Sequence, residues 1–225
     1  DGAISGVTNL SVSGTSNIGA NVTTTGTQTY SGATTLSANN TLTTTNANIT
    51  FGDTINSDST TRNLTISSGT GTTQFGGIVG GTNGIGDISI TGALDLDAAI
   101  SNASSLSVSG TSNIGANVTT TGAQSYSGTT TLSASSTLQG STITLNAVTG
   151  SSQALTITGD LDLDGAISGV TNLSVSGTTN VGANVTTTGT QTYSSTTTVS
   201  ASSTLSGTEI TSAAIVLNDN LNITN

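Results

Sequence analysis

The stretch Leu10-Ser-Val-Ser-Gly-Thr-Ser-Asn-Ile-Gly-Ala-Asn-Val-Thr-Thr-Thr-Gly-Thr-Gln-Thr-Tyr-Ser31 decides the fold, because the chain contains it three times in nearly the same form. It belongs to a longer unit that runs from Asp1 to Leu42, from Asp97 to Leu138 and from Asp164 to Leu205. The first and third copies are identical at 35 of 42 positions. Such a repeat predicts a fold that stacks one supersecondary unit on the next. We therefore expect one continuous domain over residues 1–225 with three sequence modules, 1–96, 97–163 and 164–225.

Short segments in which apolar and polar residues alternate recur along the whole chain. This period of two is typical of a β-strand with one buried face. The β-branched residues and the frequent glycines disfavour helix. The segments are Leu10-Ser-Val12, Leu64-Thr-Ile66, Ile88-Ser-Ile90, Leu94-Asp-Leu96, Leu106-Ser-Val108, Ile143-Thr-Leu145, Leu155-Thr-Ile157, Leu161-Asp-Leu163 and Leu173-Ser-Val175. Each is too short for a sandwich strand and suits one side of a coil.

The spacing of the apolar residues predicts an all-β solenoid. Leu94, Ile100 and Leu106 follow one another at six-residue intervals. Three such sides with corners suggest a coil of about 22 residues and roughly ten coils for the chain. At ~4.8 Å between stacked strands, the rod would be about 50 Å long. We expect a right-handed parallel β-helix, with a left-handed β-helix as the alternative, because six-residue spacing also suits hexapeptide solenoids.

The distances between modules indicate that the array gains or loses whole coils. The interval from Asp1 to Asp97 is longer than the interval from Asp97 to Asp164. The additional residues lie mainly between Leu64-Thr-Ile66 and Ile88-Ser-Ile90, a separation of about one coil. A solenoid tolerates such changes, since each coil contacts only its neighbours.

The composition argues against an enzyme. The chain has no His, Cys, Met, Trp or Pro, and Arg62 is its one basic side chain. Its many hydroxyl groups have no His or Lys to activate them as nucleophiles. Zinc, copper and iron–sulfur sites need imidazole or thiolate ligands. We expect no catalysis and no cofactor, with calcium, discussed below, as the one candidate exception.

The charge limits the partners. The formal net charge is −10, which repels nucleic acids and anionic membrane surfaces. No stretch approaches the ~18 consecutive apolar residues of a transmembrane helix. We therefore expect no nucleic-acid partner and no membrane insertion in this segment.

Three stretches carry a resemblance to a known class of proteins. They are Asn21 to Ser31, Asn48-Ile-Thr-Phe-Gly-Asp-Thr-Ile55 and Asn63 to Gly77. In the style of their repeats they resemble very large bacterial surface proteins of the filamentous-haemagglutinin type. The resemblance implies a right-handed parallel β-helix, secretion to the bacterial cell surface, and a role in adhesion or in a fibrous extracellular layer. It brings no catalytic residues.

The two ends of the sequence lack the atypical polar coil that caps a solenoid. Asp1 aligns with Asp97 and Asp164, each of which closes a Leu-Asp-Leu-Asp run, so the chain begins within a repeat. We expect a slice of a longer repeat protein. Its partners would be other copies of itself or neighbouring repeats in a fibre, with host or cell-surface glycans as further candidates.

A candidate calcium site lies in Asp160-Leu-Asp162-Leu-Asp164-Gly165, which matches the opening of a calcium loop. The twelfth position of such a loop should be a bidentate Glu, but here it is Thr171. The alternative is a strand with Leu161 and Leu163 inward and the three aspartates outward. We favour the strand, and keep calcium as a hypothesis because neighbouring carboxylates repel one another.

Three further patterns have both a functional and a structural interpretation. Thr23–Thr25, Thr43–Thr45, Thr119–Thr121 and Thr186–Thr188 suggest a threonine array, but their long spacing predicts solvated β-surface and no ladder. Tyr30, Tyr126 and Tyr193 occupy one repeat position, where we favour core packing, with the hydroxyl at the rim, over sugar binding. Asn-x-Ser/Thr occurs ten times, and we attribute most occurrences to the abundance of Ser and Thr.

The glycine-rich run Gly76-Gly77-Ile-Val-Gly80-Gly81 predicts a turn and not a phosphate-binding loop, because no Lys and no helical pattern follow it. Together these observations favour a non-enzymatic extracellular structural or adhesive fibre protein. The alternative is a module that binds ice or a polysaccharide through a flat face. A lyase or hydrolase on the same fold is the weakest hypothesis.

Overall fold

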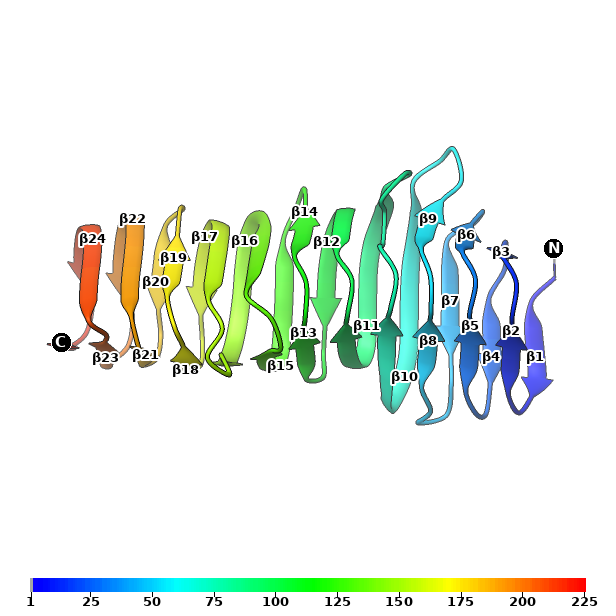
Figure 1. Cartoon of the computed structure of the whole chain (residues 1–225), viewed down its shortest axis with the longest axis horizontal. Helices are drawn as coiled ribbons and strands as arrows, with labels where there is room; N and C mark the ends of the chain where they lie inside the picture. The colour runs from blue at the N-terminus through cyan, green and yellow to red at the C-terminus, as the bar shows by residue number, and fades with distance from the viewer. Residues whose placement is uncertain (1) are drawn as a thin grey trace.

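The computed structural model describes residues 2–225, so Asp1, where the first module begins, lies outside the described residues. Every helical or strand element in the described part of the chain is a β-strand, and the strands follow one another along a rod (Figure 1). The strands are β1 Ile4–Val7, β2 Leu10–Val12, β3 Ser16–Ile18, β4 Val22–Thr24, β5 Gln28–Tyr30, β6 Thr34–Leu36, β7 Asn40–Thr43, β8 Ile49–Phe51, β9 Ile55–Ser57, β10 Arg62–Phe75, β11 Ile85–Leu96, β12 Ile100–Val108, β13 Ser112–Ile114, β14 Val118–Thr120, β15 Gln124–Leu132, β16 Ser136–Thr149, β17 Leu155–Leu163, β18 Ile167–Val170, β19 Leu173–Val175, β20 Thr179–Val181, β21 Val185–Thr187, β22 Thr190–Val199, β23 Ser203–Ser206, β24 Glu209–Leu217 and β25 Leu221–Thr224.

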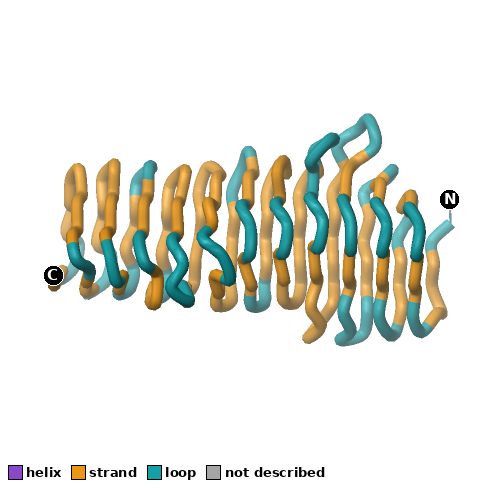
Figure 2. The backbone as a smooth tube through the Cα atoms, viewed as in Figure 1, coloured by secondary structure: helices purple, strands orange, loops and turns teal. Residues whose placement is uncertain are grey.

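The fold is a parallel β-solenoid of about 12 turns, which confirms the predicted all-β repeat architecture. Each strand inside the rod pairs in parallel with the strand one turn earlier and one turn later, so the backbone tube forms stacked turns from one end of the rod to the other (Figure 2). With strands ~4.8 Å apart, the rod is about 55 Å long.

Three stacked columns of inward-facing residues define the three sides of the coil. The first side contains Ile4, Val22, Leu42, Ile66, Ile90, Val108, Tyr126, Leu145, Leu163, Val181, Val199 and Leu217. The second contains Leu10, Gln28, Ile49, Thr73, Leu94, Ser112, Thr130, Val148, Ile167, Val185, Leu205 and Ile223. The third contains Ser16, Thr34, Ile55, Val79, Ile100, Val118, Leu138, Ile157, Val175, Tyr193 and Ser212.

Most coils are shorter than predicted, which corrects the expectation of about 22 residues and roughly ten coils. Leu106 in β12 pairs with Gln124 in β15. The hydrogen bond from Ser105 to Asp87, which also joins adjacent coils, spans 18 positions. Between Leu106 and Gln124, Ser112 lies on the second side and Val118 on the third, so each side takes six residues. The six-residue interval already includes the corner between two sides, so no further corner residues are added to the length of the coil.

Longer coils occur in the first module. Leu64 in β10 pairs with Ile88 in β11, and the hydrogen bond between Asp87 and Asn63 in the same two coils spans 24 positions. This interval is therefore one coil, as predicted. The added residues lie at corners: some lie within β10, between Ser67 and Thr72, and others form a bulge of loops beside β9 (Figure 1). The Gly76–Gly81 run lies outside the named strands but is more than a turn, because Val79 in its middle is buried and bridges Ile55 and Ile100 on the third side.

One hydrophobic core runs through the described coils. Inward residues such as Leu64, Ile66 and Leu132 have no exposed surface. On the second side Tyr30 stacks on Phe51 with ring centroids 5.0 Å apart, and Phe51 contacts Phe75 at 5.7 Å. Each such side chain contributes roughly 1.5–3 kcal/mol through burial. Pairing between coils and this shared core together make the rod continuous.

The three sequence modules do not occupy the same side of the rod. Tyr30 lies on the second side, Tyr126 on the first and Tyr193 on the third. The residues that pair in turn with Tyr30 on the second side are Phe51, Phe75, Leu96 and Ile114, which lies four turns later. The chain then crosses two more sides before it reaches Tyr126 on the first side. The next module lacks one of these turns, as predicted for whole-coil changes. Each module therefore contains a whole number of turns plus two sides. Equivalent residues of successive modules consequently lie on different sides of the rod.

Candidate functional surfaces

The aspartates of the candidate calcium site lie on β17 and just after it. Leu161 and Leu163 are buried, and Asp160, Asp162 and Asp164 lie at the surface, as the strand alternative predicts. The Asp160 Oδ1 accepts the backbone N–H of Thr178 at 2.8 Å, and the Asp162 Oδ1 accepts the Asn180 side-chain amide at 2.8 Å. These contacts tie two carboxylates to the next coil.

Within residues 2–225 the structure brings no group of three or more acidic side chains into an arrangement that could hold a metal ion. Calcium binding at Asp160, Asp162 and Asp164 therefore depends on the sequence pattern and stays a prediction. It predicts a higher melting temperature in calcium than in chelator. Identical melting temperatures would contradict it.

The three tyrosines lie inside the core, in agreement with the packing interpretation. Their hydroxyl groups are not at the rim, however, and this part of the prediction is wrong. The Tyr126 hydroxyl donates to the Gln124 Oε1 at 2.9 Å, and the Gln124 Nε2 donates to the carbonyl of Gln139 in the next coil at 2.7 Å. Burial raises the pKa of the Tyr126 phenol far above its usual range. The Tyr126 hydroxyl is therefore paired with the buried Gln124 side chain and not with solvent.

The same network occurs once in each module. Gln28 and Gln191 repeat the contacts of Gln124, accepting from Tyr30 at 3.1 Å and from Tyr193 at 3.0 Å. Their Nε2 groups donate to the carbonyls of Thr43 and Ser206 at 2.9 and 2.7 Å. All three glutamines have no exposed surface. The alternation of apolar and polar residues does not indicate these glutamines, because they are polar, although each occupies an inward position two residues before the tyrosine.

The threonine triplets do not form flat arrays. The central residue of each triplet is buried, and the structure corrects its interpretation as solvated surface. The Thr120 hydroxyl donates to the Gly122 carbonyl at 2.8 Å, and Thr24 and Thr187 make the equivalent bond at 2.6 and 3.0 Å. Central threonines therefore close corners, and the outer ones face solvent.

Asparagine side chains at the corners accept hydrogen bonds from backbone N–H groups of the next coil. The Asn117 Oδ1 accepts the backbone N–H of Thr137 at 2.8 Å, and the Asn184 Oδ1 accepts that of Thr204 at 2.8 Å. The same kind of contact is made by Asn9, Asn21, Asn39, Asn48, Asn63 and Asn172. An Asn at a corner followed by one inward and one outward residue explains why Asn-x-Ser/Thr is so frequent.

A ladder of hydroxyl groups does exist, and its six main residues lie outside the threonine triplets. On the first side the outward residues Thr41, Thr65, Ser89, Ser107, Ser125 and Thr144 stack in register, one per coil. Thr43, Ser67 and Thr91 form a shorter second column beside them. Asp162 then occupies the outward position next to Thr144. The uncharged stretch therefore covers six coils.

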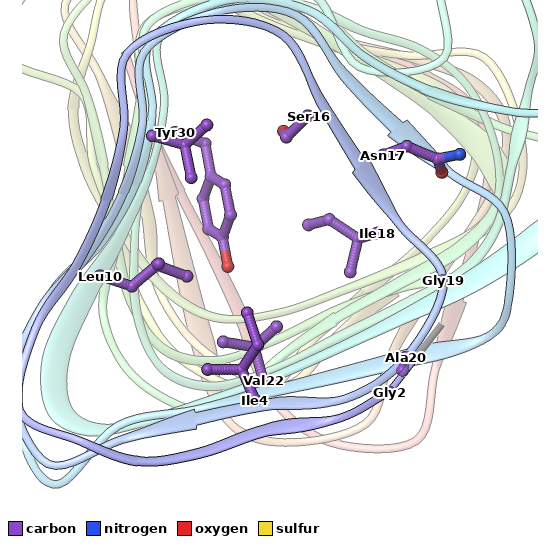
Figure 3. A pocket seen from close by; sticks show the side chains of 11 residues that line it. Gly2, Ile4, Leu10, Ser16, Asn17, Ile18, Gly19, Ala20, Val22 and Tyr30 are labelled. Atoms are coloured by element: carbon purple, nitrogen blue, oxygen red, sulfur yellow. The ribbon is translucent and has the colours of Figure 1, made fainter.

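The cavities lie at the ends and corners of the rod. An apolar cavity of about 210 Å³ opens in the first coil, where Leu10, Val22 and Tyr30 point into the coil interior and Asn17 points away from it (Figure 3). An open groove of about 530 Å³ crosses three coils at the corner lined by Thr119, Gln139 and Thr158. Among the described residues, no Asp, Glu or Arg lines either cavity.

The one ion pair found among the described residues lies in the bulge beside β9. The Arg62 guanidinium donates to both carboxylate oxygens of Asp58, at 3.0 and 2.8 Å. The hydrogen bond from Arg62 holds the pKa of Asp58 below its usual value. This pair closes a surface loop at the start of β10.

The described residues contain no helical segment whose length and hydropathy suit a bilayer crossing. Comparisons with protein-family models, with curated proteins and with solved structures find no match to this chain.

Proposed function

We propose that this chain is a non-enzymatic structural segment of an extracellular fibre, a stalk or filament in which the solenoid sets reach and rigidity. The observation that carries the proposal is the continuous stack of about 12 parallel turns on one shared core. A rod of this kind changes length by whole coils without altering its cross-section. The extra coil of the first module is such a change.

The chemistry of the surface supports the same role. The described side chains include one cationic group, Arg62, and it is paired with Asp58. The buried glutamine and tyrosine pairs satisfy one another, and Tyr30, which lines the cavity of the first coil, donates a hydrogen bond from its hydroxyl to Gln28. The resemblance to filamentous-haemagglutinin-type surface proteins agrees with a secreted, cell-surface location.

The partners that we propose are neighbouring repeats or other copies of this chain. Each coil pairs with the next through parallel strands on its sides, and strand edges favour pairing with another strand.

The experiment is to image the source cells with an antibody against this segment. The purified segment is screened in parallel for thermal hysteresis and for glycan binding. We expect labelled fibres, no hysteresis and no saturable glycan binding. Strong hysteresis or a saturable glycan site, without labelled fibres, would overturn the structural role.

The hydroxyl ladder of the first side favours a second candidate function. Six stacked outward hydroxyls at a spacing of ~4.8 Å form a regular uncharged surface, which suits ordered water or a crystalline polysaccharide. In the same screens, Ser89→Asp would interrupt this surface in the middle. Loss of binding in that variant, with an unchanged melting temperature, would support this second function.

A further inference from the structure

The bulge beside β9 contains Asn83-Gly84, the one Asn-Gly pair in the sequence. Both residues lie outside the strands, immediately before β11 begins at Ile85. The Asn56 Oδ1 accepts the backbone N–H groups of Thr82 and Asn83 at 2.8 and 3.2 Å. The Asn83 Nδ2 donates to the Ser57 carbonyl at 3.2 Å. The loop is therefore held to the previous coil by two asparagine side chains.

The amide of Gly84 is free to react. Among residues 2–225 no hydrogen bond from the Gly84 N–H is found. Glycine also has no side chain that would hinder an approach to the neighbouring carboxamide. At the corner asparagines Asn9 and Asn117 the following residue is fixed: the Leu10 N–H donates to the Thr27 carbonyl at 2.9 Å, and Val118 begins β14.

We propose that Asn83 is the site at which this chain loses an amide group spontaneously. Water or hydroxide removes the proton of the Gly84 amide, and its nitrogen bonds to the Asn83 Cγ. The Cγ–Nδ2 bond breaks, and Nδ2 takes up a proton and leaves as ammonia. Water then opens the resulting cyclic imide at either carbonyl, which gives aspartate or isoaspartate. The net reaction consumes one water and releases one ammonia, and asparagine is known to be labile in this way.

The modification changes the middle of the rod and not its ends. The product carboxylate has lost the donor that bonds the Ser57 carbonyl, so one contact between adjacent coils disappears. Isoaspartate also lengthens the backbone just before Ile85, which is buried in the core. Each event adds one negative charge to a chain whose formal charge is −10. In a long-lived fibre, these changes would accumulate at this one coil.

The test is to incubate the whole folded chain at mildly alkaline pH and to map its peptides by mass spectrometry over time. We expect loss of the unmodified peptide at Asn83, with release of one ammonia per chain, and intact amides at Asn9 and Asn117. In urea, which frees their backbone, these other asparagines should begin to react.

Two variants distinguish this chemistry from general lability. Gly84→Ala should slow the reaction, because the added methyl group hinders attack; its nearest neighbour is the side-chain end of Asn102 at 2.7 Å, which can move aside. Asn83→Gln should abolish it, while keeping a side-chain amide. An unchanged rate in Gly84→Ala, or faster loss at another asparagine in the folded chain, would overturn the proposal.

Discussion

Buried glutamines show how single polar residues fix the position of one coil on the next. The Gln124 side chain accepts from Tyr126, which lies two residues away, and donates to a carbonyl of the following coil. A buried amide without partners costs free energy, so this arrangement favours one register over its alternatives. Because equivalent residues of the three modules lie on different sides of the coil, each of the three sides contains one glutamine and tyrosine pair.

Removal of this network is expected to destabilise the rod. Gln124→Ala removes the 2.7 Å donor of the Gln139 carbonyl, leaves the Tyr126 hydroxyl unpaired and opens a cavity, which should lower the free energy of unfolding by about 2–4 kcal/mol. Tyr126→Phe should cost about 1–2 kcal/mol. Ser125→Ala, on the outward position between them, is the matched control, and urea unfolding is the measurement. Equal midpoints for all three variants would contradict this role.

The equivalent glycines Gly14 and Gly110 provide a second prediction. A Cβ on Gly110 would overlap the Gly92 carbonyl oxygen of the preceding coil, whereas a Cβ on Gly14 meets no atom within 4 Å. Gly110→Ala should therefore cost about 1–3 kcal/mol through overpacking. Gly14→Ala should be neutral or slightly stabilising, because alanine restricts the unfolded chain. Thermal melts followed by circular dichroism test the difference, and similar melting temperatures would refute it.

Much of the residue pattern could be predicted from the sequence, and the exceptions have a physical cause. Alternation identified Leu161 and Leu163 as inward, and the repeat position of Tyr126 indicated packing. Gln124 did not stand out because apolar residues define the alternation, although this polar residue continues it. The role of Asn117 was hidden in a motif that also signals glycosylation. Buried polar residues in a repetitive core can be predicted only when the inward positions of the repeat are assigned first, whatever residue type occupies them.

At the scale of the strand, the six-residue side is the unit of construction. Leu106, Ser112 and Val118 are successive inward positions on three different sides. The six-residue period is present in the sequence, but adding separate corner residues to the three sides led to an expected coil length of about 22 residues, which is too long. Handedness does not follow from pairing between adjacent strands, so the right-handed coil and its left-handed alternative both stay predictions.

Deletion of a whole coil should be tolerated. Removal of Ser107–Gln124 joins Leu106 to Ser125, which pairs with Ser107 and would take its place one coil earlier. We expect a folded, cooperatively melting rod. Removal of residues 107–115 alone shifts the following strands by half a coil and turns their inward residues outward.

The readouts are far-ultraviolet circular dichroism and resistance to protease. The half-coil deletion should lose both its cooperative melt and its protection, and the whole-coil deletion should keep them. A result in which both deletions behave alike would show that the columns of inward residues do not set the register.

For the molecule as a whole, ionisable groups are few and are confined to the surface, apart from the tyrosines. The sequence has no His and no Cys, the two residue types whose ordinary side-chain pKa values lie between about 6 and 9. The Arg62 hydrogen bond lowers the pKa of Asp58, so this pair stabilises the fold above the unfolded pKa of Asp and is lost as the pH falls below it. Stability should accordingly be flat across the neutral range.

Alkali should unfold the rod through its three tyrosines. Burial raises the pKa of Tyr30, Tyr126 and Tyr193 above the value near 10 that holds for the unfolded chain. A raised folded-state pKa means that the stability is complete below about pH 10 and falls as the pH rises further. Each tyrosine then contributes a loss of about 1.4 kcal/mol per pH unit, or about 4 kcal/mol per unit for all three.

Ultraviolet absorbance of tyrosinate, recorded together with circular dichroism, tests this expectation. Ionisation should be delayed beyond the range of free tyrosine and should coincide with loss of the strand signal, because the phenols ionise when the core opens. A variant with Tyr126→Phe should lose stability less steeply with pH, since two tyrosines then remain. If the tyrosines ionise near pH 10 while the strand signal persists, the phenols are not held in a closed core, and the network of glutamine and tyrosine pairs does not lock the coils.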